Sequence, residues 1–199
     1  SRRRHTRLRT VTGVQTCALP ICDTAKNTGD VLLTGTRTIA SLAVGASATG
    51  TVTVTVPSTT GLGTYYLLAC ADDTAVLTEA DETNNCRASS STVVVGRPDL
   101  AATAISTPAT GVAPGSTFSA TDTVSNGGTV AAGSSTVRYY LSGDTAKNTG
   151  DVLLTGTRTI ASLAVGASAT GTVTVTVPST TGLGTYYLLA CADDTAVLT

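Results

Sequence analysis

The feature that most constrains this chain is an exact internal repeat. Residues 23–78 recur without a single change as residues 144–199, an offset of 121 residues. Self-similarity at a spacing close to one domain length indicates tandem modules. Because cores tolerate many volume-conserving substitutions, identity over the 56 residues reflects recent duplication or an assembly error rather than a demand of folding. The sequence therefore predicts the C-terminal part of one module (23–97) and the N-terminal part of the next (98–199), both truncated.

One composite module, read from Pro98, predicts short strands separated by turn residues. The expected strands are 100–105, 117–125, 135–141, 157–160, 167–177 and 185–192, with 86–95 as the closing strand in the earlier copy. Val173, Val175 and Val177 alternate with threonines, so all three valines lie on one face. The run 126–128 (Asn-Gly-Gly) is expected to supply the positive φ angles of a turn. About seven short strands in one module are typical of an antiparallel β-sandwich in an all-β protein.

Five short motifs occur in order along one module. They are Pro98-Asp99-Leu100, Ala113-Pro114-Gly115, and the runs 124–128, 137–142 and 79–85. Together they resemble CARDB, the cell-adhesion-related domain found in bacteria, over essentially all of residues 23–199. The resemblance implies an immunoglobulin-like or fibronectin-like sandwich in exported, multi-module proteins of the bacterial surface or medium. Against that pattern, the first copy lacks its two opening strands and the second lacks its closing strand.

Residues 1–22 differ from the rest of the chain. They hold the only histidine, His5, two of the five cysteines and half of the ten arginines. The run 11–21 resembles translated sequencing-adapter DNA of the kind found at the ends of unrelated metagenomic proteins. The segment is too polar for a signal peptide, and the spacing of Cys17, Cys22 and His5 fits no zinc pattern. We therefore expect residues 1–22 to be non-native, disordered and outside the fold.

Charge and composition exclude several classes of function. Without the leader, the body carries 7 basic and 13 acidic residues, so it offers no basic stripe for nucleic acid. No apolar run approaches the roughly 18 residues of a membrane span. The body has no histidine, and so lacks the usual base of Ser-His-Asp and Cys-His sites. The sequence predicts that the chain is not an enzyme.

The body contains three cysteines: Cys70, Cys86 and Cys191, the last being the repeat of Cys70. Cys70 falls late in one expected strand and Cys86 opens the next, so a disulfide between them is geometrically reasonable. The partner of Cys191 would lie at position 207, beyond the sequence. A disulfide implies an oxidising compartment, which favours an extracellular or cell-surface location.

Two acidic loops are the candidate metal sites. The calcium ligands would be Asp144, Asn148, Asp151, Asp72 and Asp73, since calcium takes oxygens from carboxylates and amides. Their spacing is not that of an EF-hand. The alternative is that these side chains cap their own turns, and no other cofactor is expected.

The predicted function is a non-catalytic extracellular module that acts as a spacer or adhesive repeat. Its partners would be neighbouring domains of the same polypeptide, with a surface protein or polysaccharide as a candidate ligand. The alternative is a carbohydrate-binding accessory module of a secreted hydrolase. In that case the outward members of the pairs Tyr139-Tyr140 and Tyr186-Tyr187 would form a small stacking platform.

Overall fold

The computed structural model describes residues 11–18, 24–106, 108 and 111–194, with the backbone alone for 11–18. The chain divides into two compact units between Val95 and Gly96. Every regular element in these ranges is a β-strand and every pairing of strands is antiparallel, which confirms the predicted all-β class. The described residues include no helix long and apolar enough to cross a membrane.

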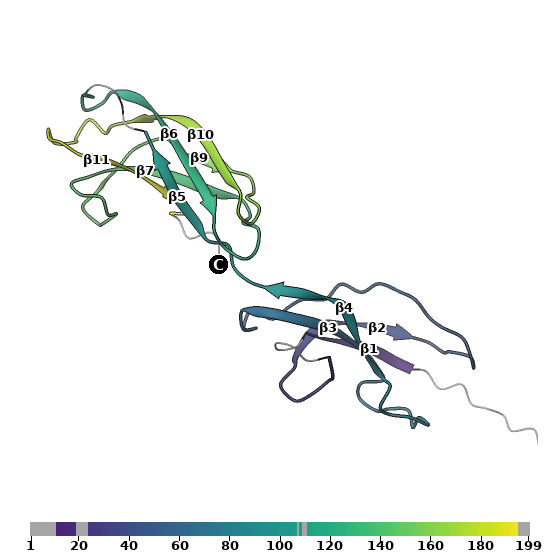
Figure 1. Ribbon diagram of the computed structural model, residues 1–199. Coiled ribbons are helices and arrows are strands. Elements are labelled where there is room, and N and C mark those ends of the chain that lie inside the picture. Colours follow the sequence, from purple (N-terminus) through teal and green to yellow (C-terminus); the bar gives the residue numbers. More distant parts are fainter. Residues whose placement is uncertain (1–10, 19–23, 107, 109–110, 195–199) are drawn as a thin grey trace, which may run out of the picture. The chain divides into compact units, whose positions relative to one another are not determined.

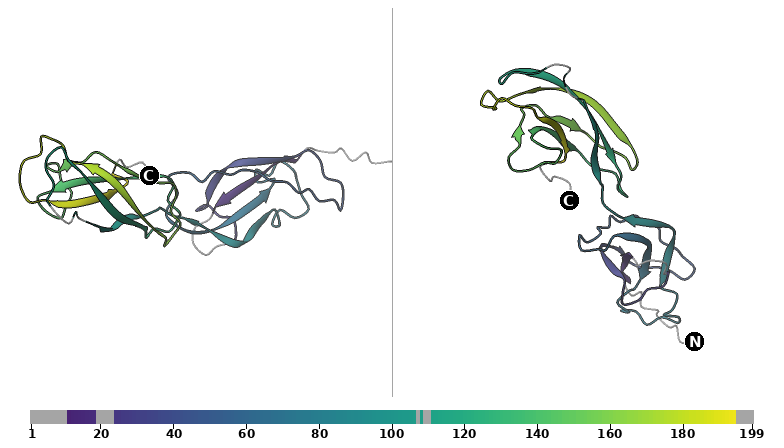
Figure 2. Two further views of the ribbon diagram at one scale, coloured as in Figure 1. Left: turned by 90° about the horizontal axis from the view of Figure 1, so that it is seen from above. Right: turned by 60° about the vertical axis from the view of Figure 1, so that its left-hand side comes forward.

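The second unit is a two-layer sandwich (Figures 1 and 2). One sheet has the order β10-β6-β5, and the other has the order β11-β7-β8, with β9 also paired to β7. The strands are β5 Leu100–Ile105, β6 Thr117–Asn126, β7 Ser135–Ser142, β8 Val152–Leu153, β9 Arg158–Ile160, β10 Ser168–Thr176 and β11 Tyr187–Ala192. The strand expected over 157–160 is therefore only the second of two short strands, and β8 was not predicted.

The period-two pattern of β6 and β10 places their apolar side chains between the two sheets. Val175 is fully buried opposite Phe118, and Val124 is fully buried further along β6. The core between the layers also takes Tyr139 from β7 and Leu188 from β11. On the outer face, threonine hydroxyls pair across the strands, as for Thr121 and Thr172 at 2.8 Å. The alternation of valine and threonine in β10 thus separates core from solvent as expected.

The turn after β6 corrects one prediction, because residues 126–128 do not adopt positive φ. Instead, the buried Asn126 side chain holds the turn with its Oδ1 and Nδ2 atoms. Its Oδ1 accepts hydrogen bonds from the amides of Asp99 and Gly128, at 3.1 and 3.0 Å. A Cβ at Gly128 would come within 2.6 Å of the carbonyl carbon of Pro98. Gly128 is therefore required by the close approach of two backbones rather than by its own conformation.

The first unit consists of a single described sheet of order β2-β1-β3-β4. Its strands are β1 Val11–Ala18, β2 Val31–Ile39, β3 Gly63–Ala71 and β4 Cys86–Val95. The bounds of β4 are those predicted. Its buried cluster is small, with Leu68 and Cys70 at the centre and Tyr66, Cys86 and Ala88 packed against them.

Strand β1 corrects the prediction that residues 1–22 lie outside the fold, as far as 11–18 are concerned. Its Val14 is in register with Ala71 of β3 and Arg37 of β2. In the second unit, Val137 of β7 is in register with Ala192 and Arg158, which are the repeats of those two residues. The leader strand therefore occupies the place of β7, because a backbone ladder accepts any extended segment that fits the gap. Residues 1–10 and 19–22, including His5 and Cys22, lie outside the described residues.

Candidate functional site

A buried polar network in the second unit was missed by the sequence analysis. Asp122 projects inward from the middle of β6 and has a fully buried side chain. Its carboxylate accepts a hydrogen bond from the Tyr139 hydroxyl at 2.5 Å and one from Arg158 Nε at 2.9 Å. The Arg158 Nη2 atom also bonds the second carboxylate oxygen, so the arginine is held by both oxygens. The period of β6 already placed Asp122 on the inward face, and this was the signal for a buried partner.

The electrostatics of this network favour a structural role. Burial, and then the hydrogen bond to Asp122, raise the pKa of Tyr139 far above its usual value of 10.0. The hydrogen bond with Asp122 also raises the pKa of Arg158. Tyr139 therefore stays protonated and Arg158 stays charged at neutral pH. Both groups are donors that point at one carboxylate, so the network neutralises itself and leaves no base for a substrate.

Strand β10 makes room for the side chain of Arg158. Gly171 of β10 is in register with Asp122, and a Cβ at Gly171 would lie 2.6 Å from Cδ of Arg158. The arginine stem thus passes over a residue that has no side chain. A larger residue there would displace the guanidinium from the carboxylate that neutralises it.

A second cluster lies at the end of β11. Asp194 has a side chain only 8% exposed and forms an ion pair with Lys147 Nζ at 2.8 Å. The Tyr140 hydroxyl also donates to Asp194, and the Lys147 ammonium lies 5.0 Å from the centre of the Tyr140 ring. Burial opposes ionisation of Asp194, but the bonds from Lys147 and Tyr140 outweigh it and lower its pKa. The bond to Asp194 raises the pKa of Lys147, so the amine is protonated and is not a nucleophile.

The candidate calcium ligands of the second unit accept hydrogen bonds from backbone amides of their own loop. Asp144 Oδ1 accepts from the amide of Ala146 at 2.8 Å, and Asp151 Oδ2 accepts from the amide of Asn148 at 2.7 Å. Asn148 Oδ1 accepts from the amide of Gly150 at 3.0 Å. These contacts are the turn-capping geometry that was the alternative explanation of the loop.

The candidates of the first unit behave in the same way. The buried carboxylate of Asp72, whose φ is 47°, accepts from the amides of Val76 and Leu77 at 3.1 and 2.7 Å. Asp73 forms an ion pair with Lys26, the repeat of the pair between Asp194 and Lys147. Asp72 and Asp73 are thus tied to separate parts of the loop. Calcium binding by these two loops stays a prediction.

Cys70 and Cys86 form the predicted disulfide, with their Cα atoms 4.0 Å apart and in register across β3 and β4. The described residues contain one close group of three metal-ligand atoms, and it consists of these two cysteines and Asp73. Because both sulfurs are joined to each other, that group does not present two thiolates to a metal. Cys191, the repeat of Cys70, is a free thiol whose pKa is raised, chiefly by burial.

The tyrosines do not form the expected platform on β7. Tyr139 is buried in the core, and Tyr140, although it points away from the core, is only 8% exposed beneath its contacts with Lys147 and Asp194. Tyr186 and Tyr187 are 37% and 55% exposed. Among the described residues of this unit, Tyr186 and Tyr187 are therefore the tyrosines with exposed side chains.

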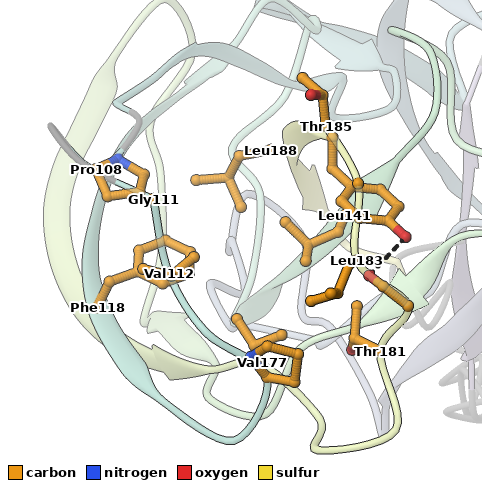
Figure 3. A pocket seen from close by; sticks show the side chains of 14 residues that line it. Pro108, Gly111, Val112, Phe118, Leu141, Val177, Thr181, Leu183, Thr185 and Leu188 are labelled. Atoms are coloured by element: carbon orange, nitrogen blue, oxygen red, sulfur yellow. Dashed lines mark hydrogen bonds between the residues drawn. The ribbon is translucent and has the colours of Figure 1, made fainter.

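An apolar hollow of about 360 Å³ opens beside β11 (Figure 3). Phe118 of β6 lies across the hollow from Leu141 of β7 and Leu188 of β11. The hollow therefore lies between the two layers at one end of the sandwich. The Tyr186 hydroxyl donates to the Gly182 carbonyl at 3.1 Å along its rim. The size suits a small apolar group, but the charged clusters described above lie outside its lining.

Comparison with known proteins gives one result. The model of the CARDB family matches residues 24–89 and 97–198, which is one segment in each unit. No curated protein matches the chain, and no solved structure matches it.

Proposed function

The chain belongs to the CARDB family, a cell-adhesion-related family of bacterial domains, and from this premise we propose that it is a spacer and adhesive repeat of a secreted or surface protein. The role is non-catalytic and depends on the fold rather than on a reactive site. The family and the immunoglobulin-like sandwich of the second unit support this proposal.

The observation that carries the proposal is the shortness of the connection between the two units. Strand β4 ends at Val95 and β5 begins at Leu100, so only residues 96–99 connect them. The Arg97 carbonyl accepts from the Thr129 amide at 3.0 Å, and the Asp99 carbonyl accepts from the Gly127 amide at 2.8 Å. Both of these bonds lie within the second unit, so they hold residues 97–99 to that unit. A connection this short, with Pro98 in it, is expected to limit the motion of one unit against the other, as a spacer repeat requires.

The disulfide supports the proposed location. A bond between Cys70 and Cys86 persists in an oxidising compartment, as found outside the bacterial cytoplasm. The charged groups support the non-catalytic role, since Asp122, Arg158 and Asp194 are each neutralised within the fold.

The spacer role is tested by the rotational motion of the two units in the full chain. NMR relaxation of backbone amides gives a correlation time for each unit. A stiff connection makes both units report the same slow tumbling, and a variant with Gly-Ser-Gly-Ser inserted after Val95 should give two shorter correlation times. If the unaltered chain tumbles as the insertion variant does, the spacer proposal is wrong.

The carbohydrate-binding alternative now depends on Tyr186 and Tyr187 alone. In the first unit, Tyr65 is the repeat of Tyr186, and it is 7% exposed because β4 covers that edge. The exposure of Tyr186 therefore accompanies an uncovered strand and is not a property of the repeat itself. Titration with soluble polysaccharides would support the alternative only if Tyr187→Ala abolished a binding signal that Tyr66→Ala left intact.

A further inference from the structure

Three metal-ligand atoms of the first unit lie close together where the loop 72–85 joins β3 to β4. They are Sγ of Cys70, Sγ of Cys86 and a carboxylate oxygen of Asp73, all within 4.8 Å of one another. Bonds of about 2.0–2.3 Å to a zinc ion place two of its ligands at most about 4.6 Å apart. The three atoms therefore need only a small shift to contact a single ion.

The backbone holds the two cysteines in place without help from the bond between them. Cys70 and Cys86 are in register across β3 and β4, with their Cα atoms 4.0 Å apart. On one side the ladder continues to Ala88, and on the other the Ala71 amide donates to the Asn85 carbonyl at 2.8 Å. These backbone bonds do not involve the sulfurs, so they remain when the disulfide is reduced. The two thiols of the reduced chain therefore still face each other.

The carboxylate of Asp73 already has a cation beside it. Its side chain is only 8% exposed and forms an ion pair with Nζ of Lys26. The Lys26 side chain is 41% exposed, so its ammonium can turn into solvent when another cation takes its place. Two thiolates and this carboxylate together carry three negative charges within 4.8 Å, and these charges repel one another unless a multivalent cation binds. The reduced group is therefore complementary to a divalent metal ion.

We propose that the thiols of Cys70 and Cys86, before the disulfide between them forms, bind a zinc ion together with the carboxylate of Asp73. Thiolate ligands select zinc over calcium and magnesium, which prefer oxygen ligands. Three protein ligands leave the fourth position of a tetrahedral zinc ion to water. Binding releases the two thiol protons to solvent, since the ligands are the deprotonated sulfurs.

The zinc ion and the disulfide exclude each other, so the site depends on the redox state of the chain. At the location proposed above, the protein is made in a reducing cytoplasm and then enters an oxidising compartment. There, oxidation joins the two sulfurs and releases the zinc ion. The two electrons pass to a disulfide of an oxidoreductase, whose cysteines take up two protons from solvent. Either cross-link closes the loop 72–85, and this step alone rests on the proposed function.

The test uses the full chain with Cys17→Ser, Cys22→Ser and Cys191→Ser, which leaves Cys70 and Cys86 as its thiols. A phosphine reduces the disulfide to two thiols, is itself oxidised to the phosphine oxide, and is removed under argon. Co²⁺ is then titrated as the probe. Its visible absorption distinguishes tetrahedral from octahedral coordination, and its charge-transfer bands in the near ultraviolet report thiolate ligands. Zn²⁺ is added last to displace the Co²⁺.

We expect one tetrahedral, thiolate-bound Co²⁺ for each reduced chain and none for the chain with its disulfide intact. Asp73→Asn removes one of the three ligands, so it should weaken Zn²⁺ binding by at least about tenfold. The matched control is Asp194→Asn, which makes the same change at the repeat of Asp73 in the second unit. That control should leave the affinity for Zn²⁺ unchanged.

A second readout follows the fold of the reduced chain. Zn²⁺ should slow amide hydrogen exchange in β3 and β4 and leave exchange in β6 and β10 unchanged, because only the first unit holds the ion. The absence of binding, an octahedral spectrum, or equal affinities for Asp73→Asn and Asp194→Asn would overturn the proposal. So would binding by a chain whose β3 and β4 amides exchange as fast as in an unfolded peptide. The spacer role is tested on the tumbling of the oxidised chain, so either proposal can fail while the other stands.

Discussion

The two units contain the same 56 residues and fold them differently. In the second unit, residues 168–176 form β10, which pairs along its whole length with β6. In the first unit, the identical residues 47–55 form no strand and make a single bridge, between Thr55 and Thr34. Since the sequences are the same, the difference comes from the neighbour: no described strand of the first unit takes the place of β6. A valine-threonine alternation makes a segment able to form a strand, and a partner decides whether it does.

The other strand of the repeat shows the same dependence. Residues 31–39 form one long strand, β2, beside β1, while residues 152–160 form the two short strands β8 and β9 beside β7. Both copies place a glycine with positive φ at the same position, Gly35 at 116° and Gly156 at 107°. The backbone irregularity is thus a property of the sequence, and the length of the strand is a property of its surroundings.

The largest expected effect is a difference in stability between the two units, and it concerns the arginine that both have at the same position of the repeat. Asp122→Ala leaves Arg158 buried without its carboxylate and removes the acceptor of Tyr139, so it should destabilise the second unit by about 3–5 kcal/mol. Arg37 is the repeat of Arg158, but its described contact is the Ala48 carbonyl at 3.2 Å. Arg37→Ala should therefore cost the first unit less than about 1 kcal/mol. Urea unfolding of the full chain, followed by NMR signals of each unit, measures both.

A double variant sharpens that comparison. Asp122→Leu combined with Arg158→Met removes both charges and keeps the volume, so it should restore the part of the lost stability that comes from the unpaired Arg158 charge, while Tyr139 still lacks its acceptor. If Asp122→Ala costs no more than Arg37→Ala, the network is not what distinguishes the two units. If the double variant is as unstable as Asp122→Ala, the loss comes from packing or from the Tyr139 hydroxyl and not from an unpaired charge.

A smaller effect is expected at the glycine beneath the arginine. Gly171→Val places carbon atoms where the Arg158 stem is held by Asp122, and should destabilise the second unit by about 1–3 kcal/mol. Gly50 is the repeat of Gly171 in the first unit, and a Cβ at Gly50 would lie 2.8 Å from Cδ of Arg37. Among the described residues no carboxylate pairs with Arg37, so its stem can move aside and Gly50→Val should change stability by less than about 0.5 kcal/mol. Thermal unfolding of the two single variants compares them directly, and equal losses would contradict the explanation.

Most of the sandwich could be predicted because apolar and polar residues alternate along its strands with a period of two. Strands β4 and β5 have the predicted bounds, and β6, β7 and β10 differ from the prediction by one residue at one or both ends. The failures are at β8, which has only two residues, and at the start of β11, which depends on a partner strand. Strand β1 was missed because residues 11–18 resemble translated adapter DNA and were therefore expected to lie outside the fold. In the structure they fill the gap between β2 and β3.

The sites were harder to predict than the strands. The Cys70–Cys86 bond followed from two cysteines on adjacent antiparallel strands. The network of Asp122, Tyr139 and Arg158 joins three strands that lie far apart in sequence, so no local spacing relates its members. Only the inward position of Asp122 hinted at it, since an inward carboxylate in a sandwich requires a donor.

The smallest expected effect is the loss of stability of the second unit at low pH. Hydrogen bonds from Lys147 and Tyr140 lower the pKa of Asp194 below 3.8, so its contribution to stability is complete above that value. The contribution is lost as the pH falls through the lowered pKa, because the folded carboxylate must then take up a proton. We expect a loss of less than about 1 kcal/mol for the second unit between about pH 5 and pH 2, since the Lys147 partner is exposed. Urea unfolding across this range measures the loss.

Two variants show where that acid sensitivity comes from. Asp194→Asn should make the second unit less stable at neutral pH and flatten its dependence on acid, since the titrating group is gone. Asp73→Asn removes the matching ion pair with Lys26 in the first unit, where Cys17 holds the register position of Tyr140 in β7. The tyrosine bond has no counterpart in that register, so the loss at neutral pH should be smaller than for Asp194→Asn. Equal losses would mean that the lysine alone stabilises this carboxylate and that the strand beside it, β1 or β7, makes no difference.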